Sequence, residues 1–252
     1  MLRFLKNILK RTYWHFRAIL FIIVKTFLSR ELKINKLGTV IIISPHPDDE
    51  SLGCAMLIKS LANNSHNVEI IFLSQGEKSI CDENINSNVI AQIRKNMAIK
   101  ANRLLGVEEN NLHFFNFPDG DFANVSNDTI IELGKVIDDI RPDTIFIPHT
   151  WEQSPDHLFA TKILMSLVGQ KYRLMYYCVW IYYHMSILKI FRLNILNSFI
   201  HKGDITTKRE IIELYLSEKD GKGNCFSGFL PQEFLDAIGS DTELYFEVGN
   251  MK

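Results

Sequence analysis

The chain has 252 residues, 46% of them hydrophobic and 23% charged, with a formal net charge of −1. This composition excludes a disordered or low-complexity protein and is sufficient for a sizeable buried core. The cysteines lie too far apart for a zinc ribbon or a disulfide framework, which favours reduced thiols and a cytoplasmic location; they are Cys54, Cys81, Cys178 and Cys225.

The charge is unevenly distributed along the chain. Residues 1–30 carry seven lysines and arginines and no acidic residue, so this segment has a charge of +7 and the remainder, against −1 in total, has −8. A basic arm on a mildly acidic body is not typical of a nucleic-acid-binding domain. We therefore expect no nucleic-acid partner.

The first thirty residues predict a basic amphipathic helix. The apolar run Ala18–Val24 is too short to cross a bilayer, which takes about 20 residues. Wound as a helix, one face is basic and the opposite face is apolar. The basic face comprises Arg3, Lys6, Lys10, Arg17 and Lys25. The apolar face comprises Leu5, Ile8, Leu9, Phe16, Ile19, Leu20, Ile23 and Phe27.

Such a helix is typical of segments that lie flat at a membrane surface. We therefore interpret residues 1–37 as an N-terminal helix that places the protein on the inner, anionic face of a membrane. Two alternatives remain open: the helix packs on the protein itself or on a second subunit, or the segment is a signal peptide.

From Gly38 onward, short β-branched runs alternate with helical patterns. The expected elements, in chain order, are a strand at 39–43, a helix at 49–62, a strand at 68–73, a helix at 88–105, a strand at 112–115, a helix at 128–140, a strand at 144–147, a helix at 157–167 and a strand at 175–181. This alternation predicts one α/β domain over residues 38–252, a Rossmann-like sandwich with a mostly parallel sheet and helices on both faces. Ligands in such folds bind beyond the carboxyl ends of the strands.

The first chemistry-bearing segment, Ser44–Glu50, follows the first strand and reads Ser-Pro-His-Pro-Asp-Asp-Glu. His46 and Asp49 lie three residues apart and can face one crevice, and an imidazole with a carboxylate suits zinc or iron. Asp48 can act on a water molecule there without ligating the metal. Acids at a helix N-terminus also complement the helix dipole, which is the alternative for these carboxylates but leaves the histidine unexplained.

The second segment, Pro148–His157, follows the fourth strand, whose end can lie beside that of the first. His157 can then complete a set of three protein ligands with one open position, which is typical of catalytic zinc. A helix-capping or core histidine is the alternative. No Gly-x-Gly-x-x-Gly follows the first strand, which argues against a nucleotide-binding oxidoreductase.

These motifs resemble the PIG-L / LmbE-like de-N-acetylase family. The specific ones are Pro-His-Pro-Asp-Asp-Glu ending at Glu50, the later Gly53, and Pro-Asp-His ending at His157. Weaker similarities, which extend the likeness to about residues 38–220, are Phe72–Glu77, Leu104–Val107, Phe117–Gly120, and Asp204 and Ile205 with Lys208.

The resemblance implies a hydrolase that removes the N-acetyl group from an N-acetylated amino sugar. It implies that His46, Asp49 and His157 hold Zn²⁺, or another divalent metal such as Fe²⁺, and that Asp48 is the general base. Substrate-binding positions implied by the family pattern are Arg94, Asp119 and Ser154.

Two residues depart from the family pattern. Ser154 stands where relatives usually have a histidine with an acid or oxyanion-stabilising role, and Met97 stands where they tend to have a glutamate. His149, five residues before Ser154, is our candidate for the missing catalytic donor. Two other functions stay open: a catalytically impaired relative that binds a glycan or a partner protein, and an amidase for a non-sugar amide.

Overall fold

An eight-stranded sheet is the framework of the protein in its computed structural model, which describes residues 12–13, 16–17, 19–20, 23, 29–79, 84–186 and 198–249. The strands are β1 (Arg30–Glu31), β2 (Val40–Ser44), β3 (Val68–Phe72), β4 (Leu112–Phe114), β5 (Thr144–Pro148), β6 (Arg173–Tyr177), β7 (Ser198–Lys202) and β8 (Thr242–Glu247). Their order is β1-β7-β8-β6-β5-β2-β3-β4, and only the pairs that include β8 are antiparallel.

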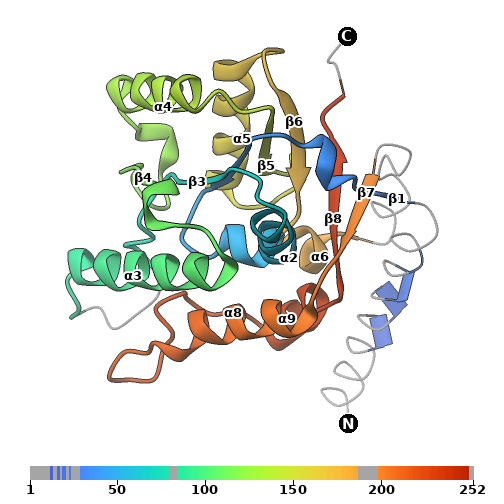
Figure 1. Ribbon diagram of the computed structural model, residues 1–252. Coiled ribbons are helices and arrows are strands. Elements are labelled where there is room, and N and C mark those ends of the chain that lie inside the picture. Colours follow the sequence, from blue (N-terminus) through green and yellow to red (C-terminus); the bar gives the residue numbers. More distant parts are fainter. Residues whose placement is uncertain are drawn as a thin grey trace.

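Helices cover both faces of this sheet (Figure 1). The helices are α2 (Asp49–Asn63), α3 (Ser87–Leu105), α4 (Asn127–Ile140), α5 (Pro155–Val168), α6 (Ile181–His184), α8 (Ile205–Ser217) and α9 (Gln232–Ile238), with 3-10 turns η1 (Ile34–Lys36), η2 (Glu109–Asn111) and η3 (Phe122–Asn124). α2, α3 and α8 pack on one face and α4 and α5 on the other (Figure 1). The predicted α/β sandwich with a mostly parallel sheet is confirmed.

β2 shows why the sheet is central. Every residue of β2 is buried, since alternate side chains enter two separate cores. Val40 and Ile42 point into the core under α2 and α3, and Ile41 and Ile43 into the core under α4 and α5. A continuous apolar run is what a parallel strand covered on both faces requires.

The position of the candidate site follows from the strand order. β2 lies between β3 and β5, because the chain passes from β2 to β3 and β4 on one side and then crosses to β5 on the other. This reversal is the topological switch point at which open α/β sheets bind ligands. The expected proximity of the first and fourth predicted strands is confirmed, because Val40 pairs with Thr144 and Ile42 with Phe146.

The part of the sheet formed by β6, β7 and β8 differs from the sequence-based prediction. β6 ends at Tyr177 and α6 begins at Ile181, so the predicted strand at 175–181 is too long at its C-terminal end. A continuous run of aromatic and aliphatic residues conceals this boundary. β7 and β8, which extend the sheet by antiparallel pairing, were not predicted.

Most of the predicted N-terminal helix lies outside the described residues. Residues 12–13, 16–17, 19–20 and 23 have helical backbone, and Arg30–Glu31 forms β1 beside β7. In the part of the chain that the structure describes, no helix is both long and apolar enough to cross a membrane. The division at residue 37 stays a prediction.

A close contact between α2 and β6 gives a first prediction. A Cβ atom at Gly53 would lie 2.4 Å from the Tyr177 ring, whose hydroxyl donates to the carbonyl of Ile43 at 2.8 Å. We expect Gly53→Ala to lower the free energy of unfolding by about 1–3 kcal/mol, the usual cost of overpacking. Urea denaturation measures the change.

Gly134 in α4 is the matched control, because the nearest atom to its added Cβ would be 3.7 Å away, on Leu167. There the same substitution should stabilise by about 0.5–1 kcal/mol, from helix propensity alone. Equal effects at the two glycines would contradict the contact argument.

Candidate metal centre

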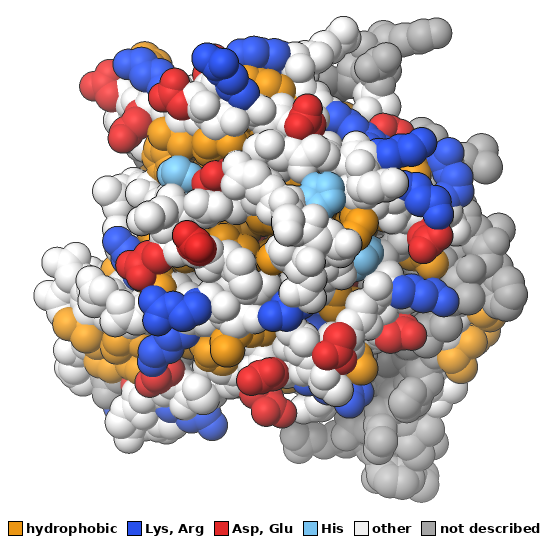
Figure 2. Space-filling view, viewed as in Figure 1, with side chains coloured by type: hydrophobic (Ala, Val, Ile, Leu, Met, Phe, Trp, Pro, Cys, Tyr) orange, Lys and Arg blue, Asp and Glu red, His pale blue; other side chains and the backbone are white. Residues whose placement is uncertain are grey.

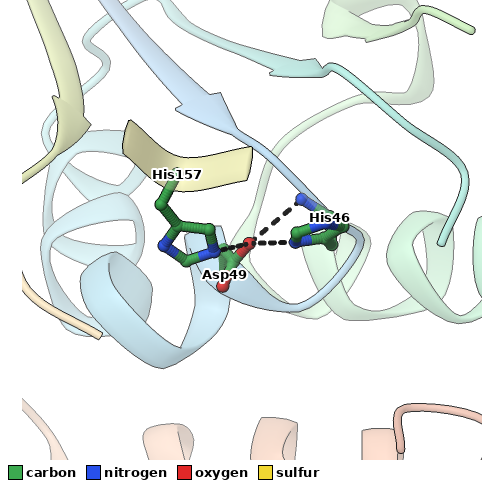
Figure 3. A group of neighbouring side chains, drawn as sticks. All are labelled: His46, Asp49 and His157. Atoms are coloured by element: carbon green, nitrogen blue, oxygen red, sulfur yellow. Dashed lines mark hydrogen bonds and ion pairs between the residues drawn. The ribbon is translucent and has the colours of Figure 1, made fainter. Parts of the chain in front are cut away.

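Three side chains from two strand ends converge at the carboxyl edge of the sheet (Figure 3). His46 lies in the turn after β2, Asp49 is the first residue of α2, and His157 lies in the first turn of α5, after β5. Their potential ligand atoms all lie within 4.8 Å of one another. The structure thus brings together the three residues predicted to hold the metal.

Asp49 Oδ2 is the common point of this group. It lies 3.1 Å from His46 Nδ1 and 3.1 Å from His157 Nε2, as the dashed lines in Figure 3 show. Asp49 and His157 are buried and His46 is partly buried. Two imidazole nitrogens and a carboxylate oxygen that face one point form a donor set suited to a borderline divalent cation such as zinc.

Asp119 and Asp156 hold the other side of the His46 ring. His46 Nε2 lies 3.1 Å from Asp156 Oδ2 and 3.3 Å from Asp119 Oδ1. Asp156 also accepts hydrogen bonds from the backbone of Gly120 and Phe122. A carboxylate on the nitrogen away from the metal is the usual way in which a histidine ligand is oriented. The loop after β4 is thereby linked to the metal group, by which we mean the candidate ligands His46, Asp49 and His157.

The electrostatics of the group favour a cation. Burial lowers the pKa of each imidazole, but the surrounding carboxylates outweigh it: the pKa of His46 is well above its usual range, and that of His157 rises to about 9. Burial alone would raise the pKa of Asp49, yet His157 and His46 hold it below its usual range. The site thus binds protons where a metal ion would supply the positive charge.

Asp48, the expected base, lies beside this group in an unusual backbone conformation. Its φ is 138°, which a residue with a side chain rarely adopts and which costs about 1–3 kcal/mol. Three contacts fix it: Glu50 Oε2 accepts from the Asp48 backbone N–H, and Arg94 Nη2 donates to Asp48 Oδ2 at 3.0 Å and to the Pro47 carbonyl at 2.7 Å. Burial raises the pKa of Asp48 to about 8 against the opposing effect of Arg94.

The predicted substrate-binding residues are already engaged by protein groups. Arg94 is buried against Asp48, and its Nε has no hydrogen-bond partner among the described residues. Asp119 accepts from the Lys78 backbone N–H at 2.7 Å as well as facing His46. Ser154 is the N-cap of α5, where its hydroxyl accepts from the backbone N–H of His157. Helix capping is a structural reason for a serine here.

His149 lies in an aromatic environment. Its ring packs against Trp151, Tyr176 and Phe246, and its Nδ1 accepts from the backbone N–H of Trp151 at 3.0 Å. Burial lowers the pKa of His149 to about 4, so the imidazole is neutral near pH 7. Its Nε2 can donate a hydrogen bond but carries no positive charge.

Sequence reasoning missed three acids that support the site. Asp156 orients His46, Glu152 faces His157 and Glu50 fixes Asp48. All three are buried, at 4%, 2% and 0% exposure, although they occur in polar segments. Their place in the segments that follow β2 and β5 was the available signal, since these segments line the crevice at the edge of the sheet.

Comparison with known proteins gives a family for the part of the chain that contains this site. The PIG-L family, GlcNAc-PI de-N-acetylase, matches residues 41–168, about half of the chain and the part that carries all three candidate ligands. The chain belongs to the PIG-L family. Asp48, Arg94 and Asp119 also lie within the matched range of this PIG-L chain.

Individual relatives of this PIG-L chain are deacetylases. Over 129 residues it is 28% identical to the diacetylchitobiose deacetylase of Thermococcus kodakarensis. The matched region covers 50% of this chain and 47% of the relative. The chain therefore matches about half the length of that relative.

Solved structures share the fold. N,N'-diacetylchitobiose deacetylase from Pyrococcus horikoshii has a TM-score of 0.61 at 21% identity, covering 80% of this chain and 79% of that one. A conserved protein from Thermus thermophilus has a TM-score of 0.60 at 20% identity, covering 85% of this chain and 96% of that one. These likenesses agree with the Rossmann-like α/β fold.

The raised pKa of His157 predicts a pH dependence of metal binding. A metal needs the ligating imidazole nitrogen unprotonated, and the His157 pKa is about 9 in the metal-free site. Below that pH the metal must displace a proton, so its apparent affinity should rise as pH rises, about tenfold per unit for each proton displaced.

Zinc titration against a fluorescent chelator, at about pH 6 and about pH 8, measures this dependence. His113 lies outside the metal group and pairs with Glu69 instead. His113→Ala should therefore keep the wild-type slope. A flat affinity over this range would contradict the proton-displacement argument.

Proposed function

We propose that this chain is a metal-dependent N-deacetylase that removes the N-acetyl group from an N-acetylated amino sugar. The observation that carries the proposal is the convergence of His46, Asp49 and His157 within 4.8 Å, next to a buried carboxylate at Asp48. Deacetylase relatives support the reaction class. The donor set of two imidazoles and one carboxylate supports zinc, with iron(II) as the second candidate.

The substrate class is proposed from the relatives. The named curated relative is a diacetylchitobiose deacetylase, and the family is described as GlcNAc-PI de-N-acetylase. Both names point to N-acetylglucosamine joined to another group. We propose an N-acetylglucosamine conjugate, with acetate and a free amino sugar as products.

Each residue has a proposed task in this hydrolysis. His46, Asp49 and His157 would hold a divalent metal, which would supply Lewis-acid chemistry for the acetyl carbonyl and the attacking water. Asp48, in its ionised form above a pKa of about 8, accepts a proton from the attacking water and returns it to the departing amine. Arg94 holds Asp48 in place through the 3.0 Å ion pair.

Asp119, Arg94 and Ser154 remain our candidates for substrate contacts, and His149 for a catalytic donor. For His149 the support is its place directly after β5, at the carboxyl edge of the sheet. Because its imidazole is neutral near pH 7, the proposed role is hydrogen-bond donation from Nε2 and not charge neutralisation.

Asp48→Asn gives the decisive test of the proposal. The amide keeps the shape of the side chain but cannot accept a proton, so turnover should fall by about 10²–10⁴-fold. Zinc content should stay near that of the wild type, because Asp48 is not one of the converging ligands. Acetate release from N,N'-diacetylchitobiose and metal analysis of the same samples are the measurements.

The outcomes separate the competing functions. Wild-type protein that binds zinc but releases no acetate from amino-sugar substrates would favour the impaired, glycan-binding relative. Release of acetate from non-sugar amides alone would favour the amidase. Loss of zinc in Asp48→Asn would mean that Asp48 is a ligand.

We also propose that the N-terminal segment brings the protein to an anionic membrane. Among its described helical residues, four apolar side chains are 44–57% exposed, and the sequence of this segment is strongly basic. They are Tyr13, Phe16, Ile19 and Ile23. Exposed apolar side chains beside positive charges are what an interfacial helix presents to anionic lipid.

The same segment also contacts the protein body. Arg17, which we assigned to the basic face, is 5% exposed and donates to the carbonyls of Tyr183 and Met185, while Leu20 packs against the core. Away from this segment, acidic and basic side chains are interspersed over the face shown in Figure 2. The proposed membrane surface is thus limited to the exposed side of the segment.

Point variants test this surface without removing Arg17 or β1. We expect the triple variant Phe16→Ser, Ile19→Ser, Ile23→Ser to have at least about tenfold lower affinity for phosphatidylserine vesicles, because less apolar surface is buried in lipid. Vesicle sedimentation at low and high salt is the measurement. Ile131→Ser, at a 54% exposed position on α4, should bind like the wild type. Equal binding by both variants would contradict the proposal.

A further inference from the structure

One nitrogen of His157 has no hydrogen-bond partner among the described residues. Nε2 faces Asp49 Oδ2 at 3.1 Å, which is the direction of the metal group. Nδ1 is buried and has no hydrogen bond to any described residue. The nearest acid is Glu152, whose Oε2 lies 3.7 Å from Nδ1, within ion-pair range but beyond hydrogen-bond length. A buried imidazole nitrogen without a hydrogen bond lowers the stability of the fold, so a group close enough to accept from Nδ1 would stabilise the ring.

Glu152 is held rigidly in a buried position. It is 2% exposed, and its two oxygens accept from the backbone N–H groups of Val179 at 2.8 Å and Trp180 at 2.9 Å. A carboxylate oxygen can accept two hydrogen bonds, so Oε2 still has capacity for a second donor. The donor that faces it is His157 Nδ1.

From this geometry we propose that Glu152 is the positioning residue for His157, which accepts the Nδ1–H hydrogen bond when Nε2 ligates the metal. The inference rests on the proposed function in so far as it assumes a metal at His46, Asp49 and His157. A movement of less than about 1 Å would bring the 3.7 Å separation to hydrogen-bond length.

The other histidine of the group supports the same arrangement. His46 faces Asp49 through Nδ1 and has Asp156 at 3.1 Å on Nε2. Glu152 stands to His157 as Asp156 stands to His46: a buried carboxylate, fixed by backbone N–H groups, on the nitrogen away from the shared Asp49 oxygen. With both acids in place, each imidazole has one tautomer that satisfies both of its nitrogens.

Glu152 further connects the metal group to the turn between β6 and α6. Its oxygens bridge that turn, at Val179 and Trp180, to the loop that carries His157. Removing the carboxylate would therefore affect both the orientation of the His157 ring and the conformation of this turn. The experiment must separate these two effects.

Glu152→Gln keeps the size of the side chain but removes its charge. For a positioning role we expect zinc affinity to fall by about 10- to 100-fold, as is usual when the partner of a histidine ligand is lost. Glu152→Asp, which keeps a carboxylate, should regain part of that loss. Glu69→Gln is the matched control: it removes a carboxylate 2.9 Å from His113, outside the metal group, and should leave zinc affinity unchanged.

A spectroscopic readout in the wild type distinguishes positioning from support of the fold. In zinc-loaded, ¹⁵N-labelled protein, His157 should be the Nδ1–H tautomer, with an Nδ1 proton shifted downfield and protected from exchange. In Glu152→Gln this proton should lose its protection.

The outcomes separate this inference from the proposed function. Wild-type protein that binds no zinc overturns both. Zinc affinity in Glu152→Gln within about twofold of the wild type, with or without loss of thermal stability, overturns the positioning role alone. If neither Glu152 variant folds, the wild-type spectrum decides: an Nδ1 of His157 that carries no proton overturns the inference.

Discussion

Parallel pairing of β2 with β5 is the constraint on which the site depends. Val40 and Ile42 of β2 pair with Thr144 and Phe146 of β5, so the two strands end at the same edge of the sheet. The segments that follow them are about a hundred residues apart in sequence, yet they meet there. A slip of this pairing by one residue would exchange the side chains facing the two cores. Hydrophobic burial within the sheet therefore fixes the separation of polar side chains at its edge.

Beyond the ligands, the site is built from buried acids held by hydrogen-bond donors. Glu50 accepts from Tyr215, Asn102 and Ser51 as well as from the backbone of Asp48. Burial raises the pKa of Glu50, and the hydrogen bonds from Ser51, Tyr215 and the Asp48 backbone partly oppose that rise. Acids buried in this way cost stability unless fully hydrogen-bonded, and they create a local negative potential that a divalent cation relieves.

The sequence was sufficient to predict the core of the fold and the convergence of the three candidate ligands. Strands such as β2 and β5 are short β-branched runs bounded by polar residues, and His46, Asp49 and His157 directly follow strand ends. The supporting acids could not be predicted in their roles, because Glu152 is held by amides at residues 179 and 180, twenty-seven and twenty-eight positions away. β7 and β8 were missed because antiparallel extension of a parallel sheet leaves no alternation of strand and helix to detect.

The backbone conformation of Asp48 sets the stability of the fold against the chemistry proposed for its side chain. A φ of 138° suits glycine, so an aspartate there is held against its own preference by Glu50 and Arg94. In a lineage freed from the need for a carboxylate, substitutions that relax this residue would be favoured by stability alone. Stability and the proposed hydrolysis thus make opposite demands on this one residue: the backbone favours glycine, and the chemistry requires a carboxylate.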